Sequence, residues 1–211
     1  SGKELPDEPA RLAIGMYGNN VDFYDIKGAV DEIMEEMGII DYDVTACAEG
    51  CPIEEYVAFH PGRSAIVTKD DTVLAIMGEL HPETLENYEI GVKAYVAKLL
   101  VPEMMSVSVT EKTYKPLPKF PATTRDLSVV CDDSITVASL EKAIKNAVGK
   151  ILEKVTLFDV YKGSQIAEGK KSVSFSISMR SMESTLTDEQ ADAAMKRVLK
   201  AMTEFGAELR A

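Results

Sequence analysis

Apolar residues follow two different periods along the second half of the chain, from about residue 120. In some stretches apolar and polar residues alternate, which is typical of strands with one buried face. In others, apolar residues recur three and four positions apart, which predicts amphipathic helices. In chain order we predict a strand at 125–132, a helix at 136–149, strands at 152–161 and 171–180, a helix at 187–206 and a short strand at 207–210.

The order of these elements, βαββαβ, is that of the ferredoxin-like fold. Thr136 and Gly149 are suitable caps for the first helix, and Thr187 with Gln190 forms a capping box at the second. In this fold both helices cover one face of a four-stranded antiparallel sheet, and the other face stays open. We therefore predict an α+β second domain with one accessible sheet face.

The alternation along the strands assigns side chains to these two faces. In strand 171–180 the residues predicted to be buried are Val173, Phe175, Ile177 and Met179, and the serines between them point the other way. We also expect Phe158, Val160, Ala207 and Leu209 to be buried. The open face then carries Asp159, Tyr161, Ser172 and Arg210.

These four side chains suit an unpaired nucleic-acid base. An exposed ring stacks on a base, short polar groups read its edges, and an arginine contacts phosphate or a π-face. The same pattern also describes an ordinary solvated sheet face, and the alternation alone favours that simpler interpretation.

The first half has a more mixed α+β pattern. A helix is predicted at 22–38, because apolar residues from Phe23 to Met37 share one helical face. Strands are predicted at 11–18, 42–49, 64–69, 72–80 and 92–101. Gly28 weakens the helix and is expected to allow close packing. His60-Pro61 and His81-Pro82 are expected at junctions between strands and loops.

A proline-rich stretch separates the halves. Residues 114–125, YKPLPKFPATTR, hold three of the nine prolines and show no apolar periodicity. We predict a first domain at 1–112, a linker at 113–119 and a second domain at 120–211.

Charge divides the chain in the same way. The formal net charge is −12, but residues 1–111 carry −15 and residues 112–211 carry +3. The acidic half is not expected to seek a phosphate backbone, whereas the second half can do so locally. Three cysteines at irregular spacing indicate a reducing, cytosolic protein without a disulfide framework.

The first half offers few groups for catalysis or metal binding. Cys47, Cys51, His60 and His81 lack the spacing of a zinc site, so buried thiols and turn histidines are the expected roles. They also form no local motif for nucleophilic catalysis. The chain contains neither a P-loop nor a G-x-G-x-x-G motif. We predict no catalytic residue, no metal and no cofactor in this chain.

A series of short motifs occurs in a familiar order: FHPGRSAIV, GELHPE, FPATTRDLSVV, LFDVYKG, GKKSVSFSI, TLTDEQ and AELR. Together with VDFYDIKGAV near the N-terminus, the series resembles the C-terminal part of the bacterial phenylalanyl-tRNA synthetase β subunit. Each motif alone is weak, and their shared order over almost the whole chain makes the resemblance specific.

The resemblance implies a division of roles. Residues 1–112 would be part of a catalytic-like module that has a class II synthetase-type fold, no catalytic function, and a surface for the catalytic α subunit. The second domain would bind the anticodon of phenylalanine tRNA through Asp159, Tyr161, Ser172 and Arg210. The full enzyme would be a cytoplasmic α2β2 ligase that uses ATP and Mg²⁺ through its α subunit. Ala97 stands where relatives are expected to have an acidic residue, so no role is carried over to it.

Two other functions stay open on the sequence. One is a stand-alone RNA-binding module without a ligase partner, and the other is a structural protein whose open sheet binds another protein. A long upstream reading frame would favour the ligase, and RNA binding would separate the two alternatives.

Overall fold

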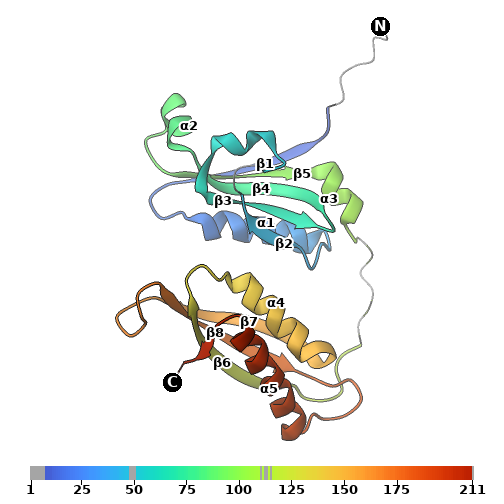
Figure 1. The fold of residues 1–211 in the computed structure, drawn as a ribbon. Coiled ribbons are helices and arrows are strands. Elements are labelled where there is room, and N and C mark those ends of the chain that lie inside the picture. The colour runs from blue at the N-terminus through green and yellow to red at the C-terminus, as the bar shows by residue number, and fades with distance from the viewer. Residues whose placement is uncertain (1–7, 48–50, 110, 112–113, 115, 211) are drawn as a thin grey trace. The chain divides into compact units, whose positions relative to one another are not determined.

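The computed structural model describes residues 8–47, 51–109, 111, 114 and 116–210, and it divides the chain into units 1–114 and 115–211 (Figure 1). Each unit has its own antiparallel sheet and its own apolar core. No helix in the described part of the chain is long and apolar enough to cross a membrane.

The first unit is a five-stranded sheet in the order β1-β5-β4-β3-β2. Its elements are β1 (Arg11–Tyr17), α1 (Phe23–Glu36), β2 (Asp43–Ala46), the 3₁₀ turn η1 (Glu54–Ala58), β3 (Phe59–Lys69), β4 (Thr72–Leu80), α2 (Pro82–Asn87), β5 (Ala94–Leu100) and α3 (Val101–Val107). Helix α1 begins at Asp22, whose side chain accepts from two backbone N–H groups of the first turn. Its apolar face buries Ile26, Val30 and Met34 against the sheet.

Two expectations for this unit are wrong. Gly28 does not mark a close approach, because a Cβ there would meet nothing within 4 Å. His60 and Pro61 are the second and third residues of β3 and not part of a loop, in a segment where the pairing with β4 is irregular between Phe59 and Ser64. That irregularity leaves room for a proline, which has no N–H to give to a regular ladder. His81 does stand at a junction, as the N-cap of α2.

The second unit has the predicted βαββαβ order, with the sheet arranged as β7-β8-β6-β9. Its elements are β6 (Thr123–Asp132), α4 (Val137–Val148), the 3₁₀ turn η2 (Gly149–Ile151), β7 (Leu152–Tyr161), β8 (Lys170–Met179), α5 (Asp188–Glu204) and β9 (Glu208–Leu209). The predicted caps are confirmed at Thr136, Gly149 and the capping box of Thr187 with Gln190.

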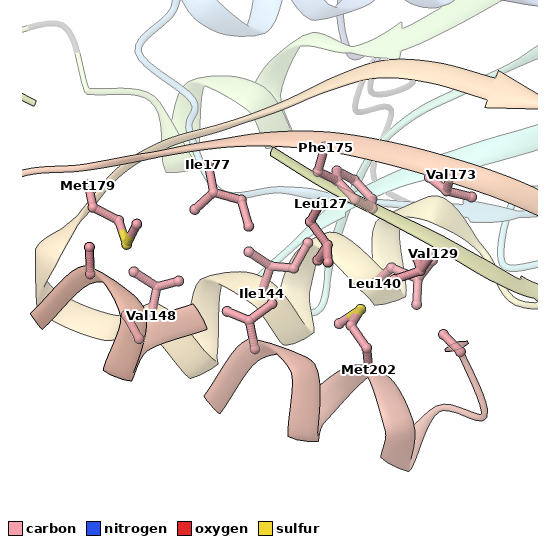
Figure 2. Packing of buried hydrophobic residues seen from close by; sticks show 14 of the residues in the cluster. Leu127, Val129, Leu140, Ile144, Val148, Val173, Phe175, Ile177, Met179 and Met202 are labelled. Carbon is pink, nitrogen blue, oxygen red and sulfur yellow. The ribbon is translucent and has the colours of Figure 1, made fainter. Parts of the chain in front are cut away.

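Helices α4 and α5 cover one face of this sheet (Figure 1). Side chains from the sheet and from both helices interdigitate in one core, which Figure 2 shows from close by. Fully buried members include Val129 on β6, Phe175 on β8 and Ile144 on α4. The opposite face has no helix over it in the described part of the unit.

Three residues expected in this core are exposed instead. Phe158 is 56% exposed, Val160 43% and Leu209 59%, whereas Ala207 is buried as predicted. The three exposed residues lie on β7 and β9, the two edge strands, whereas the helices pack over the middle of the sheet. Alternation shows which face a residue shares, but coverage of that face decides whether the residue is buried.

Candidate nucleic-acid interface

The open face of the second sheet brings together residues from both of its edges. Tyr161, the last residue of β7, pairs with Ser172 of β8, and Ser172 pairs in turn with Val130 of β6. Arg210 follows β9 and its N–H donates to the carbonyl oxygen of Ser128. This row of paired residues ends at Glu208 of β9, and Arg210 lies beside it, level with Ser128.

A β-bulge determines which side chains of β7 lie on this face. Leu157 pairs with a core residue of β8, whereas Asp159 pairs with Ser174, so β7 has one extra residue at this point, Phe158. Side chains alternate along a regular strand, and one inserted residue reverses the two faces beyond it. Without the bulge, Asp159 and Tyr161 would share the face of Leu157. With it, both lie on the open face.

Arg210 and Tyr161 meet over Ser172. The guanidinium carbon of Arg210 lies 5.5 Å from the centroid of the Tyr161 ring, within the range of a cation–π contact. Arg210 Nη1 also donates to Ser172 Oγ at 3.4 Å. Because two long side chains cover it from opposite edges, Ser172 is 0% exposed although it lies on the open face.

Asp159 completes the predicted set at the rim of this cluster. Its side chain is exposed and lies on the same face as Tyr161, two residues earlier in β7. An ionised carboxylate accepts hydrogen bonds and donates none. The structure thus joins Tyr161, Ser172 and Arg210 by direct contacts, with Asp159 beside them.

Gly163 packs directly against the end of the tyrosine ring. A Cβ at this position would lie 2.4 Å from Tyr161 Oη and 2.6 Å from Cζ, which is far too close for two non-bonded heavy atoms. Any other residue would therefore displace the ring. The glycine of the YKG sequence is explained by this contact.

Gln165 is a member of the cluster that the sequence pattern did not indicate. Arg210 Nη2 donates to Gln165 Oε1 at 3.3 Å. Gln165 lies in the loop between β7 and β8, where strand alternation carries no information. Its nearness to the YKG motif was the one available signal.

Charged groups at the same end of the sheet are paired with each other. Lys162 Nζ lies 2.5 Å from Asp133 Oδ1, and Lys171 Nζ donates to the carbonyl oxygen of Asp133 at 2.9 Å. Lys171 Nζ also lies 3.9 Å from Asp133 Oδ1, so one carboxylate partly neutralises both lysines.

Of the candidate metal ligands in the first unit, only the thiols of Cys47 and Cys51 are shown as neighbours. Among the residues that the structure describes, no group of three or more His, Cys, Asp or Glu side chains is arranged to hold a metal ion. Burial and the neighbouring Cys51 thiol raise the pKa of Cys47 to about 12, so Cys47 stays protonated and is a poor nucleophile or ligand. In both His60 and His81, Nδ1 accepts from the backbone N–H two residues later.

A buried carboxylate in the first unit belongs to a structural ion-pair group. Glu79 on β4 is 5% exposed, and both of its oxygens lie 3.0 Å from Arg63 Nη1. Lys93 Nζ lies 3.6 Å from Glu79 Oε2, and Tyr95 Oη donates to the same oxygen at 3.4 Å. Burial alone would raise the pKa of Glu79, but these partners outweigh it and hold the pKa below its usual range.

Comparison with known families assigns each unit to a domain type. Residues 118–210 match the family model described as ferredoxin-fold anticodon binding domain. Residues 1–101 match the model described as phenylalanyl tRNA synthetase beta chain CLM domain. The first match confirms the predicted ferredoxin-like fold of the second unit.

Curated relatives match nearly the full length of the chain. The phenylalanine–tRNA ligase β subunit of Clostridium acetobutylicum is 41% identical over 208 residues, which is 98% of this chain and 25% of the relative. The β subunit of Clostridium tetani is 41% identical over 99% of the chain, and that of Symbiobacterium thermophilum 37% over 99%. The chain spans about a quarter of the length of these relatives.

Proposed function

Because the chain belongs to the family of phenylalanine–tRNA ligase β subunits, we propose that it forms part of such a ligase and that its second unit binds the anticodon of phenylalanine tRNA. One observation carries this proposal more than any other. Side chains from three separate segments meet on the face of the second sheet that no described helix covers, and they form an aromatic and cationic platform.

Each side chain has a distinct part in this proposal. Tyr161 offers a ring on which an unpaired anticodon base stacks. Asp159 accepts hydrogen bonds from the N–H groups of that base, which favours a base whose edge donates. Arg210 supplies a positive charge and free N–H groups to the same nucleotide.

Ser172 acts through Arg210 in the conformation described. The sequence suggests that Ser172 contacts the base directly, but its hydroxyl is covered and accepts from the guanidinium. We propose that Ser172 holds Arg210 in place over the ring, and that it meets the base only where Arg210 shifts.

We propose that the first unit is a catalytic-like module with a class II synthetase-type fold that packs against the catalytic α subunit. In this proposal the α subunit uses ATP and Mg²⁺, the complete enzyme is a cytoplasmic α2β2 tetramer, and this chain adds no catalytic residue. The family match over residues 1–101 supports the proposal.

The test is to map where RNA binds on the 211-residue chain. Titration of the isotope-labelled chain with the anticodon stem-loop of phenylalanine tRNA should shift NMR signals of Asp159, Tyr161 and Arg210, and the affinity should fall with rising salt. Signals of the solvent-facing sides of α4 and α5 should stay in place. Shifts confined to the helices, or no binding at low salt, would contradict an anticodon site on the open face.

A further inference from the structure

We propose that Gln165 is a positioning residue that fixes the guanidinium of Arg210 over the Tyr161 ring while leaving the charge of Arg210 free for RNA. The inference rests on the anticodon-binding function proposed above. It assigns a role to the loop between β7 and β8, which neither the strand pattern nor the family descriptions single out.

The guanidinium is held at two of its corners. Nη1 donates to Ser172 Oγ at 3.4 Å, and Nη2 donates to Gln165 Oε1 at 3.3 Å. Two contacts at different nitrogens fix the plane of a guanidinium, whereas a single contact leaves it free to rotate. The carbon of the guanidinium fixed in this way lies 5.5 Å from the centroid of the Tyr161 ring.

Both anchors are electrically neutral, and this distinguishes Arg210 from the lysines nearby. Lys162 lies against the carboxylate of Asp133 at 2.5 Å, so part of its charge is already compensated. The described side-chain partners of Arg210 are a hydroxyl, an amide and an aromatic ring. An amide oxygen orients the guanidinium without forming an ion pair, so the positive charge stays available to a phosphate or a base.

The same loop also positions the ring of Tyr161. Gly163 packs against Tyr161 Oη. The carbonyl oxygen of Gly163 accepts a hydrogen bond from the N–H of Ile166, and this bond closes a turn that contains Gln165. One short turn thus carries the glycine that admits the ring and the glutamine that holds the arginine. The loop positions both halves of the platform.

The first experiment needs no RNA and uses the full 211-residue chain. The ring current of Tyr161 should shift the NMR signals of the Arg210 side-chain protons. Gln165→Met, which keeps length but removes the acceptor, should move these signals toward those of Tyr161→Ala. Gln165→Glu, which keeps an acceptor, should retain the shift. Ser164→Ala, an exposed neighbour in the same turn, should change nothing.

The second experiment measures binding of the phenylalanine-tRNA anticodon stem-loop at one salt concentration. Loss of one orienting hydrogen bond predicts that Gln165→Met binds about 2- to 10-fold more weakly. The same change in an Arg210→Ala background should have no further effect. Gln165→Glu should also weaken binding, and with a shallower salt dependence, because its carboxylate neutralises Arg210.

Four results would overturn the inference, and they separate it from the proposed function. If Gln165→Met lowered the affinity equally in the wild-type and Arg210→Ala backgrounds, Gln165 would contact RNA itself or support the loop. Tighter binding of the stem-loop by Gln165→Met would show that the contact between Gln165 and Arg210 obstructs the site. No change from Gln165→Met, beside a clear loss from Arg210→Ala, would remove the role of Gln165 and leave the anticodon site intact. No change from Arg210→Ala or Tyr161→Ala would overturn both.

Discussion

Replacement of Tyr161 by alanine should remove the stacking surface of the site. Stacking of a base on an aromatic side chain contributes about 1–3 kcal/mol, and about 1.4 kcal/mol corresponds to a tenfold change in affinity. Tyr161→Ala should therefore weaken binding of the anticodon stem-loop by about 5- to 150-fold. Tyr161→Phe keeps the ring and should cost much less.

The fold should survive this substitution. Tyr161 ends an edge strand on the open face and does not belong to the buried core of the unit. Its contact with Arg210 contributes roughly 0.5–1 kcal/mol at an exposed site, so the free energy of unfolding should fall only slightly. Val173→Ala is the matched control, because Val173 follows Ser172 in β8 but is 0% exposed in the core. It removes two buried methyl groups and should cost about 1.5–3 kcal/mol of stability without changing RNA specificity.

The assay is equilibrium binding of a fluorescently labelled stem-loop to wild type, Tyr161→Ala, Tyr161→Phe and Val173→Ala at fixed salt, with thermal melts of each protein. A folded Tyr161→Ala that binds like wild type would refute the assignment of the open face to the anticodon. The protein-interaction alternative would then become the better account of that face.

Three further predictions follow from other contacts. Gly163→Ala should displace the Tyr161 ring and weaken stem-loop binding about 2- to 10-fold, at little cost in a thermal melt, because the displaced atoms are the far end of a side chain. Gly28→Ala should stabilise the first unit by about 0.5–1 kcal/mol in urea denaturation, since the exposed helical position has open space around it. Arg63→Gln should lower the free energy of unfolding at pH 7 by about 1–3 kcal/mol, because Glu79 loses a charged partner.

The loss of stability in Arg63→Gln should depend on pH, and the pKa of Glu79 gives the direction of that dependence. The pKa of Glu79 is lower in the folded than in the unfolded chain, so its ion pairs stabilise the fold above the unfolded pKa, near 4.5. This contribution disappears as pH falls through the folded pKa, and the difference between wild type and variant should narrow there. A constant difference from pH 7 to pH 3 would show that Glu79 is not the group involved. For the glycines, contrary results would be unchanged RNA binding in Gly163→Ala and a destabilised Gly28→Ala.

Periodicity in the sequence was sufficient to predict the elements of the second unit. Strand β7 has the predicted bounds 152–161, and the capping box places the start of α5. Strong alternation and caps are local signals, and here the tertiary structure agrees with them. Strand β4 in the first unit also has its predicted bounds, 72–80.

The sequence of β7 also contains a signal for its bulge that the prediction did not use. Apolar residues occupy positions 155 and 157 and then 158 and 160, so the alternation changes phase at the doublet Leu157-Phe158. A regular strand cannot place both sets on one face, and the structure resolves the conflict with a bulge at Phe158. A doublet of this kind within an alternating strand is a usable signal for a bulge.

Two features of the site could not be predicted from the periodicity of the sequence. The complete burial of Ser172 depends on two long side chains that reach it from opposite edges of the sheet. The contact between Gln165 and Arg210 joins a loop to the residue that follows β9, 45 positions away. Both are tertiary contacts of individual side chains, and periodicity carries information only about faces.

The most direct test of the central proposal compares two RNAs on one protein. The wild-type chain is titrated at a single salt concentration with the anticodon stem-loop of phenylalanine tRNA and with the same stem-loop carrying a different anticodon. A base-specific contact is worth roughly 1–3 kcal/mol, so the phenylalanine anticodon should bind about 5-fold more tightly or better. Equal affinity for the two stem-loops would show that the open face binds RNA without reading the anticodon, and would contradict the proposal.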